Sequence, residues 1–279
     1  MVNKIVIVGV ALALSAADVA ARVDVREGNI INDTTWKRKD GIHYVHGDIT
    51  IWNGATLTIE AGVEVRFYEV TGTGGYEDGA EIVVKSGALV AGGEGGMPVK
   101  FTSANKVRKM GDWGALVVVG SNQLILKNAV VEYATNGVRL HSTNAIGASR
   151  SSFEGTIIRH CLHNGVLAYN SYANLYHLSV ENNGYAGIKT LYGCYITVNC
   201  SDIWGNGSYD FYNGSSKNVD ATNCWWGTTT PTAIEKKIYD RKDDPTKGEV
   251  DYTPYLTAPW PEGGRVPNYS LGFVKSFFK

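Results

Sequence analysis

The sequence predicts an all-β solenoid, in which short coils of strand stack on one another along a single axis. The first observation is a segment at 47–67 that alternates apolar and polar residues and breaks at glycine. A related stretch follows at 85–103, where Leu89 matches Leu57 and Phe101 matches Phe67 at offsets of 32 and 34 residues. Alternation with a period of two is typical of strands, and its return indicates a repeat.

Shorter units continue the pattern toward the C-terminus. They carry β-branched residues and Asn-Gly turns, and their inward apolar positions are separated by 27, 22, 23 and 22 residues. The predicted inward positions are Val131, Ile158, Val180, Ile203 and Trp225. One unit cannot bury its apolar row alone, whereas coils about 4.8 Å apart bury a continuous column and pair each strand with the next coil.

With these residues and spacings, the chain resembles the right-handed parallel β-helix repeat family, the secreted pectate-lyase-like solenoid superfamily, over residues 49–227. The resemblance implies a right-handed parallel β-helix with an N-terminal cap and a short C-terminal capping helix. It implies no single activity, because that family includes polysaccharide lyases, hydrolases, surface adhesins and members with no known chemistry.

Five segments are predicted along the 279 residues. Lys4, the apolar run 5–14 and the small residues 19–21 indicate a signal peptide. Thr230 followed by Pro231 predicts the start of the capping helix. The segments are a signal peptide at 1–21, an N-terminal cap at 22–48, β-helix coils at 49–227, a C-terminal cap with a short helix at 228–260 and a tail at 261–279.

Composition and charge narrow the classes of function. The chain has 26 Lys and Arg against 27 Asp and Glu, and this net charge of -1 argues against binding nucleic acid through bulk positive charge. No apolar run after the leader is long enough to span a bilayer. Together with the signal peptide, these features predict a secreted protein of the extracellular space or the cell envelope.

All four cysteines lie in the later coils, at Cys161, Cys194, Cys200 and Cys224. Export would permit disulfides, but the spacing fits buried free thiols and one disulfide equally well. It contains no Cys-x-x-Cys or His-rich pattern typical of a metal site.

The alternation also predicts an outward column that is mostly charged. This column reads Glu132, Arg159, Glu181, Trp204 and Trp226. Two glutamates two coils apart would be about 9.6 Å from each other, at the edge of the separation that inverting glycosidases use. Because Arg159 lies between them, a neutralised structural ladder is the better interpretation.

A second outward face is basic and aromatic. Its two neighbouring columns read Arg139, Leu167, Lys189, Tyr212 and His141, Tyr169, Leu191. Basic side chains beside Tyr rings can hold the carboxylates or sulfates of an extended polysaccharide, although such residues are also common on exposed strands that bind nothing. The candidate binding residues are therefore Arg139, Lys189, Tyr169, Tyr212 and His141.

The sequence assigns no catalytic residue, metal ligand or cofactor. A lyase on this scaffold could require calcium, and the closest carboxylates on successive coils are Glu181 and Asp202. Two side chains offer few oxygens for calcium, which takes six to eight.

The sequence favours a non-catalytic surface-associated protein that binds a glycan or a protein partner along a sheet face. One alternative is a polysaccharide lyase or glycoside hydrolase that acts on an acidic polysaccharide. The other is a structural stalk or filament subunit that self-assembles.

Overall fold

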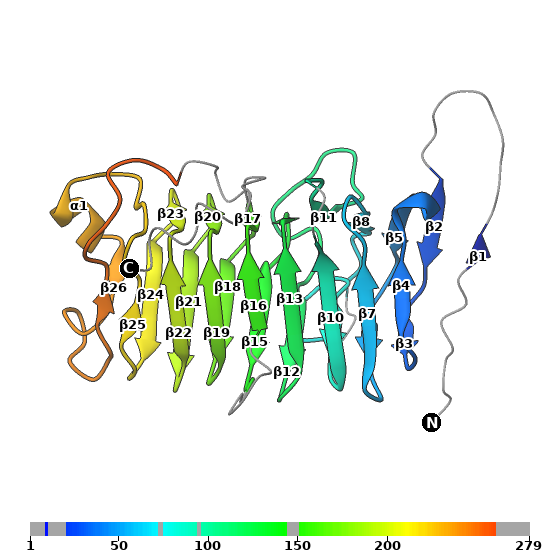
Figure 1. Cartoon of the computed structure of the whole chain (residues 1–279), viewed down its shortest axis with the longest axis horizontal. Helices are drawn as coiled ribbons and strands as arrows, with labels where there is room; N and C mark the ends of the chain where they lie inside the picture. The colour runs from blue at the N-terminus through cyan, green and yellow to red at the C-terminus, as the bar shows by residue number, and fades with distance from the viewer. Residues whose placement is uncertain (1–8, 11–20, 72–74, 94–95, 144–150, 261–279) are drawn as a thin grey trace, which may run out of the picture.

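The computed structural model describes residues 9–10, 21–71, 75–93, 96–143 and 151–260 of the chain. Its strands form three nine-stranded sheets that run side by side along the molecule (Figure 1). Every pairing between named strands is parallel except the one between β1 and β2. The structure confirms the predicted all-β, right-handed parallel β-helix.

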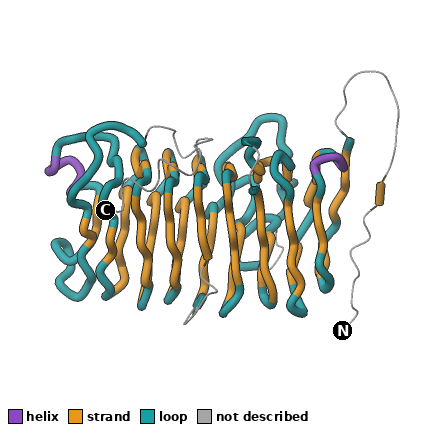
Figure 2. Tube along the Cα trace, in the orientation of Figure 1, coloured by secondary structure: helices purple, strands orange, loops and turns teal. Residues whose placement is uncertain are grey.

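Each complete coil contributes one strand to each sheet. Sheet A contains β3 (Gly28–Ile30), β6 (Ile49–Ile51), β9 (Ile82–Val84), β12 (Leu116–Val119), β15 (Val138–His141), β18 (Asn164–Tyr169), β21 (Ala186–Tyr192), β24 (Tyr209–Ser215) and β26 (Ile238–Tyr239). Sheet B contains β1 (Gly9–Val10), β2 (Arg22–Val25), β5 (Ile42–Val45), β8 (Glu64–Phe67), β11 (Val99–Ser103), β14 (Ala129–Glu132), β17 (Ile157–Arg159), β20 (Ser179–Glu181) and β23 (Asp202–Trp204). Sheet C contains β4 (Thr34–Trp36), β7 (Ala55–Ile59), β10 (Gly87–Gly92), β13 (Gln123–Lys127), β16 (Ser151–Glu154), β19 (Tyr172–Tyr176), β22 (Tyr195–Asn199), β25 (Val219–Asp220) and β27 (Val250–Asp251). Short turns join the strands, and longer loops project from one side of the solenoid (Figure 2).

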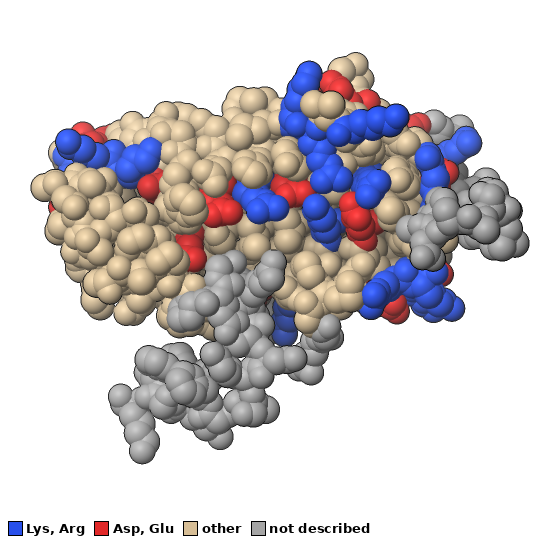
Figure 3. Space-filling model, turned by 90° about the horizontal axis from the view of Figure 1, so that it is seen from above, with Lys and Arg blue, Asp and Glu red and all other residues tan. Residues whose placement is uncertain are grey.

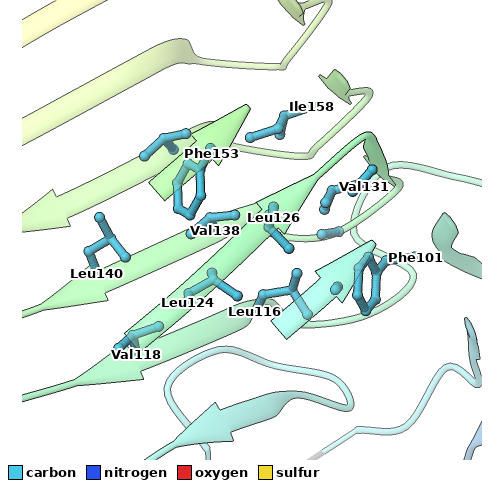
Figure 4. Packing of buried hydrophobic residues seen from close by; sticks show 14 of the residues in the cluster. Phe101, Leu116, Val118, Leu124, Leu126, Val131, Val138, Leu140, Phe153 and Ile158 are labelled. Atoms are coloured by element: carbon cyan, nitrogen blue, oxygen red, sulfur yellow. The ribbon is translucent and has the colours of Figure 1, made fainter. Parts of the chain in front are cut away.

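The core lies inside the coils, where the three sheets turn one apolar row each toward the axis. Figure 4 shows part of it, with Phe101, Leu116 and Leu126 reaching inward from different sheets. Stacking in register makes each row a column, and the buried positions of sheet B include Val131, Ile158, Val180 and Ile203. Burial of these columns provides the main driving force for folding.

Two details of the register differ from the sequence prediction. Leu89 lies beside Leu57 as predicted, but Phe101 lies beside Val65, because the connection from β10 to β11 is longer than that from β7 to β8. At the C-terminal end Trp226 faces the core and is 3% exposed. Trp225 instead pairs in a β-bridge with Asp202, which faces outward. The prediction that Trp225 points inward and Trp226 outward is therefore wrong.

Both ends of the solenoid extend further than the predicted coils. Residues 22–48, predicted as a cap, contribute strands to all three sheets and therefore form the first coil. Beyond 227, β26 and β27 continue sheets A and C beside the predicted capping helix, α1 (Pro231–Glu235). Its N-cap is Thr230 and its first residue is Pro231, as the sequence predicts. The predicted tail lies outside the described residues, as does most of the predicted signal peptide.

The corner between sheets B and A is built from glycine and buried asparagine. A Cβ on Gly137 would come within 2.5 Å of Ile158 Cγ2, and one on Gly165 within 2.6 Å of Val180 Cγ1. One coil further, the Asn183 side-chain amide donates to Asn206 Oδ1 at 3.0 Å. These close contacts fix where sheet A begins, and therefore fix the rows of side chains on its outer face.

All four cysteines are free thiols, and Cys161, Cys194 and Cys224 are buried. Burial raises the pKa of the Cys161 thiol to about 12, which keeps it in the unreactive protonated form. None of the helices in the described part of the chain has the length and apolar character that crossing a bilayer requires.

Candidate functional site

The outer face of sheet A carries both predicted basic and aromatic columns in register. Arg139 pairs with Leu167, which pairs with Lys189 and then Tyr212. His141 pairs with Tyr169, which pairs with Leu191. The five candidate binding residues therefore lie on one face, which we call the aromatic face. Its further members are Tyr76, Tyr185, Tyr209 and Tyr239.

Arg139 and His141 form the N-terminal half of the aromatic face. The His141 ring lies between Tyr76 and Tyr169, with centroid distances of 6.1 and 5.7 Å. The Arg139 guanidinium lies 5.2 Å from the Tyr169 ring and forms a 2.5 Å ion pair with Glu77. The Arg139 side chain is only 17% exposed, so its charge is already neutralised and largely covered.

Glu77 reaches the face from a glycine-rich loop that a buried carboxylate holds in place. Glu81, just before β9, accepts backbone N–H groups from Tyr76 and Glu77 at 2.8 Å each. Burial is the main cause that raises the pKa of Glu81 to about 7, and the nearby Asp48 carboxylate adds to it. The loop that covers Arg139 therefore depends on a carboxylate that titrates near neutral pH.

Lys189 is the centre of the C-terminal half. Its ammonium nitrogen lies 4.7 Å from the Tyr185 ring centroid and 4.9 Å from that of Tyr212. Tyr212 stacks on Tyr239 at 4.3 Å with an interplanar angle of 3°, and Tyr209 packs edge-on against both rings. No carboxylate in the described ranges forms an ion pair with Lys189, and burial lowers the pKa of its ammonium.

Sequence reasoning assigned neither Tyr76 and Glu77 of the glycine-rich loop nor Tyr239 of the last coil to this face. Tyr76 and Glu77 are more than 60 residues from Arg139, in the long connection 68–81 between β8 and β9, which lies outside the aligned strands. Tyr239 was missed because the predicted coils stop at 227, yet it pairs in register with Tyr212. Aligning Ile238 with Phe211 as inward residues was the one signal that could have found Tyr239.

The outer face of sheet B carries the predicted charged column, and its chemistry is different. Glu132 is 1% exposed because basic side chains from neighbouring coils cover it. Lys100 and Arg159 each contact its carboxylate at 2.9 Å, Arg108 lies at 3.7 Å, and the Thr102 hydroxyl donates at 2.9 Å. Figure 3 shows this side of the molecule, where acidic and basic side chains form a band along its length. We call Lys100, Arg108, Glu132 and Arg159 the charged seam.

The charged seam is a structural network. Burial acts to raise the pKa of Glu132, but hydrogen bonds from Lys100, Arg159 and Thr102 hold it below its ordinary value. A carboxylate held in its charged form by several donors is a poor general acid. This supports the structural interpretation of the Glu132–Arg159 pair over a catalytic one.

The predicted ladder does not continue past Arg159. Arg159 lies beside Glu181 in register, but its guanidinium donates to Glu132. Glu181 has no ion pair with any described residue, and it shares a hollow with Asp202 and two tryptophans. In the residues that the structure describes, no three His, Cys, Asp or Glu side chains gather closely enough to hold a metal ion.

Two family models together match most of the solenoid. A pectate-lyase like beta helix domain matches residues 28–150, and a right handed beta helix region matches residues 114–234. No curated protein and no solved structure matches the chain significantly. The family models therefore agree with the architecture and assign no function to the outer faces.

Proposed function

Because this chain belongs to the right-handed parallel β-helix repeat family, whose fold carries many functions, we propose a function from its faces: a non-catalytic protein that binds an acidic glycan along the aromatic face. Such a protein acts outside the cell or at its surface, in keeping with the leader-like N-terminus. The sequence left a glycan or a protein as the partner, and we choose the glycan.

The proposal depends mainly on the environment of the Lys189 ammonium group. It is a partly buried cation held between two Tyr rings, with no carboxylate partner among the described residues. A desolvated ammonium forms stronger charge-assisted hydrogen bonds than one in bulk water. A uronate carboxylate or a sulfate ester would supply the missing negative charge.

The arrangement of the tyrosines along the aromatic face favours a linear ligand. Tyr212 and Tyr239 each cover one face of the other ring, and their ring edges and hydroxyl groups can contact a ligand. Hydroxyls in a row at the strand spacing suit a chain of sugar hydroxyls, because each can donate and accept. Tyr192, which is 71% exposed and 6.2 Å from Tyr169, offers a freer ring surface at the edge of the face.

Arg139 has a smaller role in this proposal than its sequence position suggested. Its guanidinium is paired with Glu77 and also donates to the Tyr76 backbone carbonyl at 3.0 Å. A ligand anion would have to compete with a carboxylate that is already in place. Lys189 is therefore the primary anchor, and Arg139 supports the aromatic rings around His141 and Tyr169.

The test is retention of the purified chain in gels that contain a polyuronate, a sulfated polysaccharide or a neutral glucan. We expect retention by the acidic polymers, and at least about tenfold weaker binding for Lys189→Met, because one charge-assisted contact is lost. Lys217→Met is the matched control, since the Lys217 ammonium also lies over a tyrosine, 5.3 Å from Tyr195, but outside the aromatic face.

Three results would contradict the proposal. Equal retention of Lys189→Met and wild type would remove its main observation. Release of unsaturated or shortened sugars would show that the protein is a lyase or hydrolase. Concentration-dependent filaments without any glycan binding would favour the structural alternative.

A further inference from the structure

A hollow of about 390 Å³ opens on the outer face of sheet B, at the C-terminal end of the solenoid. Volumes of 300 to 1,000 Å³ are usual for small-molecule sites. It lies beyond the charged seam and is separate from the aromatic face on sheet A. Its lining is Ser179, Glu181, Asp202, Trp204, Trp225, Gly227 and Pro259.

Register explains why carboxylates and indoles meet in this hollow. Ser179, Asp202 and Trp225 occupy equivalent positions on three successive coils. Glu181 and Trp204 form the neighbouring row. One row thus carries Asp202 and Trp225, and the other carries Glu181 and Trp204. Within each row, neighbouring residues lie on coils about 4.8 Å apart.

The C-terminal segment forms one wall of the hollow. The backbone N–H of Trp260 donates to Asp202 Oδ1 at 2.7 Å, and the Trp260 ring stacks on His177 at 5.0 Å. In Figure 1 the red-orange end of the described chain lies beside the tip of β23. Asp202 is consequently 2% exposed, although it points away from the core.

The negative charge of the hollow is not neutralised by the described residues. Glu181 has no ion pair there, because Arg159 donates to Glu132. Among the hydrogen bonds of the described chain, Asp202 accepts only through Oδ1, which leaves Oδ2 without a donor. Burial, and then the charge of Glu181, raise the pKa of Asp202 to about 6 against the opposing effect of the Trp260 N–H. At pH 6.5, above this value, Asp202 is mostly in its charged form.

From this geometry we infer that the hollow binds the ammonium group of an amino sugar, with the sugar ring against Trp204 or Trp225. Carboxylates attract the cation, and indole rings attract it further through their negative faces. A hexose ring also has an apolar side that packs on an indole. The hollow is larger than a lone ammonium head group needs, which favours a whole ring over a lysine tip.

This inference does not depend on the proposed function of the aromatic face. The experiment titrates the full chain at pH 6.5, where the amino-sugar amines are protonated, with a glucosamine trimer and follows binding by calorimetry. The N-acetylated trimer is the matched ligand without charge, and trilysine is a matched cation without a sugar ring. We expect binding of the glucosamine trimer, with at least tenfold weaker binding of the other two.

The variants preserve the shape of the site. Asp202→Asn keeps an oxygen for the Trp260 N–H, and Glu181→Gln changes a side chain without partners in the described structure. We expect each to weaken binding about tenfold and the double variant to abolish it. Glu154→Gln on sheet C and Lys189→Met should bind as wild type does, which separates this site from the aromatic face.

Other outcomes overturn the inference. Equal binding of both trimers would show that the ammonium is not recognised. Equal binding of trilysine would show that a lysine side chain of a protein is recognised in place of an amino sugar. Undiminished binding by the double variant would locate the ligand elsewhere.

Discussion

Sheets A and B both carry basic side chains on their outer faces, but these side chains have different partners. On sheet B, Lys100, Arg108 and Arg159 surround the buried carboxylate of Glu132. On sheet A, Lys189 lies over the rings of Tyr185 and Tyr212. The same coil spacing thus produces an ion-pair network on one face and a cation–aromatic cluster on the other.

This difference determines which of the two faces can bind a ligand without losing a stabilising contact. A buried carboxylate with several cations is stabilised only while all of them remain, because an unpaired buried charge is strongly unfavourable. Tyrosine rings attract a cation more weakly and leave its charge unneutralised. A ligand anion can therefore join Lys189 without displacing a carboxylate, whereas at the charged seam it would compete with Glu132.

The largest effect should come from breaking the charged seam. Glu132→Gln leaves three cations near one another without their shared anion, and we expect it to reduce the free energy of unfolding by about 3 kcal/mol. Urea unfolding followed by circular dichroism measures this change. Lys189→Met should alter stability by less than about 0.5 kcal/mol, because it removes a partly exposed charge with no buried ion pair. Similar losses for both variants would mean that the two faces do not differ as described.

Titration should distinguish the two faces at different pH values. Glu81 secures the loop over sheet A, and its folded pKa of about 7 lies above its ordinary value of 4.5. The folded state therefore binds more protons between these values, and the contribution of Glu81 to stability is full below pH 4.5 and is lost as pH rises through 7. Glu132 on sheet B has a lowered pKa, so its contribution is lost only in acid, as pH falls through that value.

The measurement compares wild type and Glu81→Gln by thermal unfolding at pH 5 and pH 8. We expect wild type to lose about 1 to 2 kcal/mol more than the variant across this interval. The comparison with the variant is needed because Asp202 and Asp210, with pKa values raised to about 6, act in the same direction, while buried His43, with a lowered pKa, acts in the opposite one. Equal pH dependence in the two proteins would rule out Glu81 as the titrating group.

The sequence allowed most of the fold to be predicted, because strand alternation and repeat spacing are local signals. Register in the short coils followed from anchors such as Val131 and Ile158. It failed at Phe101, where a shift of two residues keeps every side chain on the same side, and alternation cannot detect such a shift. It also failed where Trp225 and Trp226 adjoin, because either indole could face inward.

Much less of the candidate site could be predicted. The columns of Arg139, Lys189 and Tyr212 followed from the same alignment. The alignment did not show that Arg139 would be neutralised, because its partner Glu77 lies 62 residues away in the connection 68–81, outside the aligned strands. Likewise, Arg159 lies between Glu132 and Glu181 in sequence register, and only its side-chain conformation decides which of them it contacts.

The smallest effect is expected from breaking the Arg139–Glu77 ion pair. This pair makes the N-terminal half of the aromatic face resemble sheet B, where the cations are also neutralised by a carboxylate. Glu77→Gln removes the carboxylate that neutralises Arg139 but keeps the backbone N–H that Glu81 holds. The freed guanidinium should add a second cation for an acidic glycan, and we expect two- to fivefold tighter retention in a polyuronate gel, or less than about 1 kcal/mol. Glu69→Gln, which removes one exposed carboxylate and so changes the net charge equally, should have little effect.

If the gain is specific to Glu77, it should disappear in the double variant Glu77→Gln, Arg139→Gln. A gain that persists there would mean that general charge, and not the freed Arg139, attracts the glycan to this face.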